Sequence, residues 1–220
     1  MKKSLILLPL LLVMVIVSIP VGAVSAADES SWDGKKLFMR KTCMACHGKG
    51  GAKAILSYPN LAGQEELYMV NQMKDIASGK RLASPDATGH PRTEGMKGVM
   101  HLVSTDQMKK IADWLASETP APLHKDTAKL DPSRVASGEK LYDKLKCQNC
   151  HGKEGKKPLK GMPYIAGQKQ EYLALQMIDL QSGVRKNGKS GMMKSFIKRA
   201  SDEDIQLIAD YLSQVDRSEK

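Results

Sequence analysis

The stretches Cys43-Met44-Ala45-Cys46-His47 and Cys147-Gln148-Asn149-Cys150-His151 contain all four cysteines of this 220-residue chain. Cys-x-x-Cys-His is the pattern of covalent haem attachment. Two thiols separated by two residues can reach both vinyl groups on one edge of a porphyrin, and the adjacent histidine can then ligate the iron. The sequence therefore predicts two haem c groups, attached through Cys43, Cys46, Cys147 and Cys150, with His47 and His151 as iron ligands.

Two other chemistries use paired cysteines. A zinc site would need four cysteines from two separate segments, and it would leave both following histidines unexplained. A thioredoxin-like disulfide expects a strand followed by a helix, and that pattern is missing around both motifs. Two motifs of the same form in one chain favour haem over both alternatives.

The motifs belong to a longer internal repeat. At a spacing of 104 residues the first motif aligns with the second, and the spacing later falls to 97. The first copy therefore carries seven extra residues between about Arg81 and Met96. The aligned positions include Gly34/Gly138, Pro59/Pro163, the Ala-Gly-Gln segments that end at Gln64 and Gln168, Tyr68/Tyr172, Gln72/Gln176 and Met96/Met193.

The first 26 residues are typical of a secretory signal. Lys2 and Lys3 precede an apolar run over 5–17, and Val24-Ser25-Ala26 fits the cleavage pattern. Cleavage after Ala26 removes 26 of the 220 residues, leaves 194 and predicts a periplasmic protein. A retained membrane anchor is the alternative, although the apolar run is short for a bilayer span.

A mature chain of this length accommodates two domains. We expect them over 28–118 and 133–217, joined by a proline-containing linker over 119–132. Each copy predicts an all-α fold: a helix from Asp33 or Val135 into the cysteine motif, one over 64–78 or 168–182, and a last helix that starts at Ser104 or Ser201. Ser104 and Gln107 have the spacing of a capping box. The glycine- and lysine-rich stretches after each histidine are predicted to be loops.

The formal charge of +10 admits nucleic acid, an anionic membrane surface or an acidic protein as a partner. A secreted destination and the lack of a basic patch interleaved with aromatic residues argue against nucleic acid. Peripheral membrane association stays open, and so does the simpler interpretation that the lysines maintain solubility. We expect a monomer.

Each half resembles a class I cytochrome c, and the duplicated arrangement resembles the di-haem cytochrome c4 type. The resemblance covers nearly the whole mature chain and rests on the haem motif, the later proline, the methionine and the terminal helices. It implies that each domain wraps around one haem and that the first and last helices cross closely at a glycine. It also implies that the carbonyls of Pro59 and Pro163, each 12 residues after its histidine, accept a hydrogen bond from the ligating ring.

The sixth iron ligands are predicted from the repeat. Met96 and Met193 each stand eight residues before the start of the last helix. Met100 aligns with an isoleucine and Met192 with a glycine, so neither has a duplicated partner. The remaining histidines are weaker candidates, because they lie opposite a lysine, in the insertion or in the linker: His101, His90 and His124.

Arg81 and Arg185 follow Gly79 and Gly183 by two residues in equivalent positions. A guanidinium can bind a haem propionate through two parallel hydrogen bonds. The alternative is that both are ordinary exposed arginines of a basic protein.

An iron with histidine on one face and methionine on the other has no open coordination site. It exchanges single electrons and does not bind a substrate easily. The sequence thus predicts an electron carrier, not an enzyme, with redox partners such as a terminal oxidase or an upstream dehydrogenase or cytochrome complex. One alternative is a cytochrome subunit of a flavin, quinoprotein or sulfur-oxidising enzyme, and a less favoured one is a haem enzyme in its own right.

Overall fold

The computed structural model describes residues 28–123 and 130–217. Within these residues it contains helices and no strand, apart from one isolated bridge between Pro85 and Pro91. The all-α prediction is confirmed. The predicted signal segment and residues 124–129 of the predicted linker, with His124, lie outside the described residues. No helix in the described ranges is long and apolar enough to cross a membrane.

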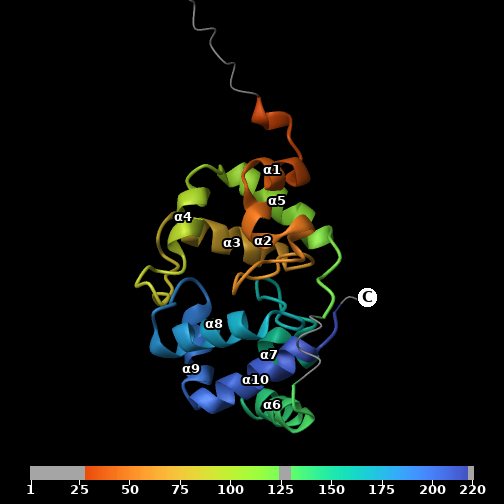
Figure 1. Cartoon of the computed structure of the whole chain (residues 1–220), viewed down its shortest axis with the longest axis vertical. Helices are drawn as coiled ribbons and strands as arrows, with labels where there is room; N and C mark the ends of the chain where they lie inside the picture. Colours follow the sequence, from red (N-terminus) through yellow and green to blue (C-terminus); the bar gives the residue numbers. More distant parts are fainter. Residues whose placement is uncertain (1–27, 124–129, 218–220) are drawn as a thin grey trace, which may run out of the picture. The chain divides into compact units, whose positions relative to one another are not determined.

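Residues 28–31 contain a 3-10 turn, η1 (Glu29–Ser31), and belong to a separate short unit, whereas the chain from Trp32 onward forms one compact unit. The same order of elements occurs twice in that unit (Figure 1). The first copy contains α1 (Gly34–Arg40), α2 (Cys43–His47), η2 (Lys49–Gly51), α3 (Glu66–Ala77), α4 (Glu94–Met100) and α5 (Thr105–Ser117). The second contains α6 (Pro132–Lys144), α7 (Gln148–His151), η4 (Lys153–Gly155), α8 (Gln170–Ser182), α9 (Ser190–Ile197) and α10 (Asp202–Gln214).

The first helix of each copy does not continue into the cysteine motif, contrary to expectation. In the first copy α1 ends at Arg40, and Thr42 has a left-handed backbone with φ 62°. In the second copy Lys146 has the same φ of 62° after α6. A left-handed residue interrupts the i to i−4 hydrogen bonds of a helix. The chain therefore turns before each motif, which starts a short helix of its own.

The last helices begin where the sequence predicts. Ser104 caps α5 and Ser201 caps α10, and both form a complete capping box, with Gln107 and Asp204 respectively. Two helices were not anticipated, α4 and α9, and they carry Met96 and Met193. Their glycines, their lysines and their length of seven or eight residues left little helical pattern in the sequence.

The first and last helices of each copy cross in close contact, α1 against α5 and α6 against α10 (Figure 1). A Cβ atom on Gly34 would lie 2.0 Å from the Lys110 carbonyl oxygen, and one on Gly138 would lie 2.0 Å from that of Leu207. Only glycine allows the two backbones to approach so closely. Aromatic pairs close the same crossings: Phe38 with Trp114 and Tyr142 with Tyr211.

The seven extra residues of the first copy lie against the second copy. They belong to a segment in which Ser84 and Arg92 both bind Asp179 of α8. Arg92 donates to both carboxylate oxygens at 3.1 Å, and Asp179 is fully buried. The equivalent residue of the first copy, Asp75, instead accepts a 2.7 Å hydrogen bond from the amide of Asn187. Asp179 therefore has a charged partner in the other copy, Arg92, whereas Asp75 has a neutral one, Asn187.

Replacing Gly138 with alanine should destabilise the protein by about 1–3 kcal/mol, because the new methyl group overlaps the Leu207 carbonyl and the Cβ of Tyr211. Thermal unfolding of the haem-loaded protein measures the loss. Gly191→Ala is the matched control, since no atom lies within 4 Å of a Cβ at that helical position. It should leave stability unchanged or raise it slightly. Equal losses in both variants would contradict the role assigned to the helix crossing.

Replacing Asp179 with asparagine should lower the unfolding free energy by about 1–3 kcal/mol, because the partly exposed Arg92 loses its charge-assisted hydrogen bonds to a buried carboxylate. Calorimetry of the holoprotein should show this loss, with the two copies unfolding less cooperatively. Asp75→Asn is the control, since Asp75 meets only a neutral amide across the interface. If both variants lose the same stability, the charge of Asp179 has no special role.

Candidate functional site

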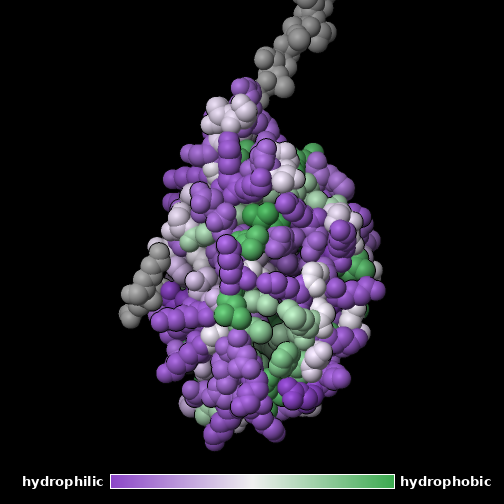
Figure 2. Space-filling view, turned by 180° about the vertical axis from the view of Figure 1, so that it is seen from behind, coloured by the Kyte–Doolittle hydropathy of each residue, from purple (hydrophilic) through white to green (hydrophobic). Residues whose placement is uncertain are grey.

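A cavity of about 1040 Å³ is lined by residues of both copies. On one face of the molecule, a hollow lined with apolar residues opens in an otherwise hydrophilic surface (Figure 2). The cavity volume of about 1040 Å³ is slightly above the range of roughly 300–1,000 Å³ that is usual for small-molecule sites. The cavity brings together every site residue predicted from the sequence: Cys43, Cys46, His47, Pro59, Arg81 and Met96 from the first copy, and Cys147, Cys150, His151, Pro163, Arg185 and Met193 from the second.

Both histidines of the motifs are buried and oriented by a carbonyl. The Nδ1 atom of His47 lies 2.9 Å from the Pro59 oxygen, and that of His151 lies 2.9 Å from the Pro163 oxygen. Burial lowers the pKa of both rings, and the proline carbonyls partly oppose this effect. A neutral ring whose Nδ1 donates to a carbonyl keeps Nε2 as the electron pair for a metal.

The cysteines fit attachment better than redox or zinc chemistry. Burial raises the pKa of the Cys43 and Cys147 thiols to about 11, which makes them weak nucleophiles. All four cysteines are within the described ranges and form no disulfide. Among those same residues, no three His, Cys, Asp or Glu side chains gather as a metal site of their own. The zinc and disulfide alternatives therefore find no support.

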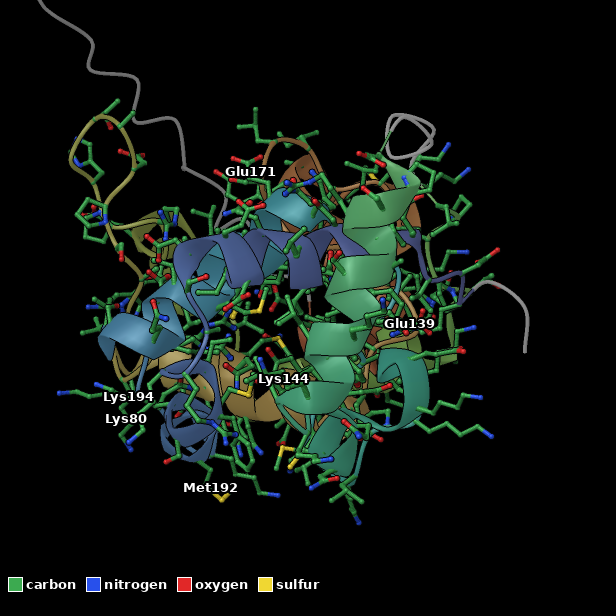
Figure 3. All side chains as sticks on the ribbon, turned by 90° about the horizontal axis from the view of Figure 1, so that it is seen from below. Lys80, Glu139, Lys144, Glu171, Met192 and Lys194 are labelled. Carbon is green, nitrogen blue, oxygen red and sulfur yellow. The ribbon has the colours of Figure 1, made fainter. Side chains whose placement is uncertain are left out.

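The candidate methionines differ in their exposure. Met96 and Met193 are partly buried and pack against the core of their own copy. Met192 is 53% exposed, and its sulfur points away from the protein (Figure 3). Met100 is 1% exposed, as is the aligned Ile197, so both occupy a core position.

Arg185 is buried and Arg81 is partly buried between the copies, so neither is an ordinary exposed arginine. Arg81 donates to Tyr172 and Gln176, both at 3.0 Å. Arg185 donates to four neutral oxygens, on Gln176 at 2.7 Å, Gln72 at 3.1 Å, Tyr68 at 3.2 Å and Asn187 at 3.4 Å. Neither guanidinium forms an ion pair within the described part of the chain.

The Arg81 and Arg185 guanidiniums both act on the phenol of Tyr68 between the copies. Burial alone would raise the pKa of Tyr68, but Arg185 and Arg81 reverse the shift and lower it. A buried charge is costly unless an opposite charge compensates it. The cavity, the oriented histidines and two guanidiniums whose direct hydrogen-bond partners are neutral all fit an apolar, planar group with anionic substituents, and haem has both properties.

The comparisons with known proteins agree with this geometry. The family model described as Cytochrome c matches residues 31–119 and 135–216. The chain is 32% identical to cytochrome c4 of Azotobacter vinelandii over 198 residues, which are 86% of this chain and 89% of the relative.

The chain belongs to the cytochrome c family and is of the di-haem c4 type. It binds two haem c groups, and its function is electron transfer, not enzymatic catalysis. Reduced recombinant cytochrome c4 from Pseudomonas stutzeri has a similar structure, with a TM-score of 0.69 and 28% identity over 83% of this chain and 97% of that one. A thiosulfate dehydrogenase electron acceptor of Stutzerimonas stutzeri is 28% identical over 204 residues, 85% of this chain and 88% of the relative.

Several residues of this di-haem cytochrome received no role from the sequence. Gln64, Gln168, Tyr68 and Tyr172 recur at the repeat spacing, but recurrence alone does not reveal that they reach across to the other copy. Arg92 gives even less signal, because it lies in the segment without a counterpart. The spacing of repeats identifies equivalent residues within each copy, and it carries no information on how two copies dock.

Proposed function

We propose that the protein is a periplasmic carrier that moves single electrons between partners of a respiratory chain. In this proposal His47 and Met96 are the axial ligands of one iron, and His151 and Met193 those of the other. The observation that carries it is the convergence of an oriented neutral histidine and a partly buried methionine on one cavity, in both copies.

When bound, each haem supplies a one-electron iron couple. The residues of the chain bind it, orient it and limit its access to water. The Pro59 and Pro163 carbonyls hold the histidine rings and increase their basicity. Held by His47 and Met96, or by His151 and Met193, an iron would have no ready site for a substrate, and it would supply electron exchange.

We assign Arg81 and Arg185 to the haem propionates. Both guanidiniums line the cavity, are at least partly buried and have only neutral hydrogen-bond partners. Propionates would accept charge-assisted hydrogen bonds from them.

The proposed domains cover 28–118 and 133–217, with 119–132 as the linker. The signal pattern of the first 26 residues supports the periplasmic location, and the proposal includes cleavage after Ala26. Acidic redox proteins suit the basic charge of the chain, and we expect a freely diffusing monomer. The second candidate function is that of a cytochrome subunit that works with one enzyme. The similarity to a thiosulfate dehydrogenase electron acceptor favours this alternative.

Replacing Met193 with histidine should abolish the long-wavelength absorption of a methionine–iron(III) bond at one of the two haems and lower its potential. The spectrum and a redox titration of the oxidised holoprotein measure both effects. Met192→His is the matched control, because its side chain is exposed. Half the absorption should disappear in the first variant and none in the second. The reverse pattern would assign the iron to Met192.

Purification of the native protein from the periplasmic fraction should give a chain that starts at Ala27, and intact mass should show two haem additions. No catalytic chain should accompany it, because the proposed carrier diffuses freely. An intact Met1 would contradict cleavage. A second, catalytic chain in stoichiometric amount would replace the free carrier by the subunit alternative.

A further inference from the structure

The glutamines of the two Ala-Gly-Gln segments reach across the interface in a reciprocal way. Gln168 accepts a hydrogen bond from the Asn60 N–H at 2.9 Å and donates to the Asn60 carbonyl at 2.9 Å. Gln64 accepts from the Tyr164 N–H at 2.8 Å and donates to the Tyr164 carbonyl at 2.9 Å. Both glutamines are at least nine-tenths buried, at 7% and 8% exposure, so water does not compete for these bonds.

The residues that the glutamines bind directly follow the prolines of the histidine contacts. The N–H of Asn60 and the C=O of Pro59 belong to one peptide group, and that carbonyl accepts from His47 Nδ1. A hydrogen-bonded chain therefore runs from His47 through this peptide group to Gln168 of the other copy. The second chain runs from His151 through the peptide group of Pro163 and Tyr164 to Gln64.

Hydrogen bonds arranged in this way strengthen each other. When a peptide N–H donates, its carbonyl oxygen becomes more negative and accepts more strongly, by roughly 10–30% per bond. A stronger acceptor draws the Nδ1 proton of the histidine and makes the ring a better electron donor at Nε2. A more basic ligand stabilises the oxidised metal and lowers its reduction potential.

We propose that Gln168 tunes the haem of the first copy and that Gln64 tunes the haem of the second, each through the proline peptide of the opposite domain. The inference rests on the proposed ligation by His47 and His151. Gln64 and Gln168 are positioning residues, since they act through the peptide and the ring. Docking of the two copies thereby sets both reduction potentials, which would not be so for two independent domains on a linker.

Contacts around the two peptide groups show that the arrangement is held on both sides. The Asn60 side chain accepts from the Ala54 N–H at 3.0 Å, which fixes the residue within its own copy. Arg217 of the second copy donates to the carbonyls of Ala62 and Gly63, next to Gln64, and stacks over the Tyr164 ring. Asn60 is thus held within its own copy, and Arg217 links the segment before Gln64 to the Tyr164 side chain.

The test is a crossed pair of variants in the full-length holoprotein. Gln168→Leu should raise the potential of the first haem and leave the second unchanged, whereas Gln64→Leu should do the opposite. The equilibrium constant for reduction of the affected haem should increase roughly two- to tenfold, or about 20–60 mV for one electron. Spectroelectrochemical titration gives the potentials, and the Nδ1 nitrogen shifts of His47 and His151 by NMR show which ring has changed.

Ser84→Ala is the control, because it removes a hydrogen bond between the copies without a change of charge and outside both chains. It should move neither potential. Equal shifts in Ser84→Ala and the glutamine variants, a shift in the haem of the variant's own copy, or no shift would each overturn the proposal. If Gln168→Leu fails to assemble, Gln168→Met preserves the side-chain length and should give the same crossed shift.

The NMR signals of the ligands distinguish a wrong ligation from an absent tuning effect. If the unmodified holoprotein lacks the NMR signals of histidine and methionine ligands at either iron, the proposed ligation is wrong. If those signals are present and the crossed shift is absent, only the tuning by Gln64 and Gln168 is wrong.

Discussion

The crossing of the first and last helices in each copy is the contact on which the rest of the structure depends. Gly34 and Gly138 allow the first and last helix of each copy to pack in direct contact. The cysteine motif, the proline-containing loop and the helix that carries the methionine are then attached to this pair of helices and line the cavity. Small domains bury a smaller fraction of their surface on folding than large ones, so their stability is marginal. Each copy has a helical frame around a hollow, and the cofactor completes the core that the chain itself lacks.

The interface between the copies obeys a different constraint, because it is polar and largely buried. Arg81, Arg185 and the paired tyrosines and glutamines lie where each copy meets the other, and polar groups there are stable only if they find partners. Most of these partners belong to the opposite copy. The buried side chains consequently specify one docking arrangement, as an apolar contact of the same size would not.

The sequence predicted the chemistry of the site much better than its surroundings. The cysteine motifs, the prolines and the capped last helices are local patterns or recur at a constant spacing, and such patterns can be recognised in a single sequence. The helices that carry Met96 and Met193 were missed because their glycine- and lysine-rich sequences lack a clear apolar period. The burial of Arg81 and Arg185 was open as well, since it depends on the second copy, and no local pattern encodes a contact between residues about one hundred positions apart.

Duplication alone does not explain the observed interface, because the copies contribute unequally to it. The first copy offers Arg92 to a buried carboxylate, and the second offers only the amide of Asn187 at the equivalent place. The insertion that supplies Arg92 therefore strengthens docking from one side. If the peptide chains to Gln64 and Gln168 tune the histidines, the docking that Arg92 helps to hold is a precondition for that tuning. An insertion in a loop is then a means of adjusting two redox centres without any change in their ligands.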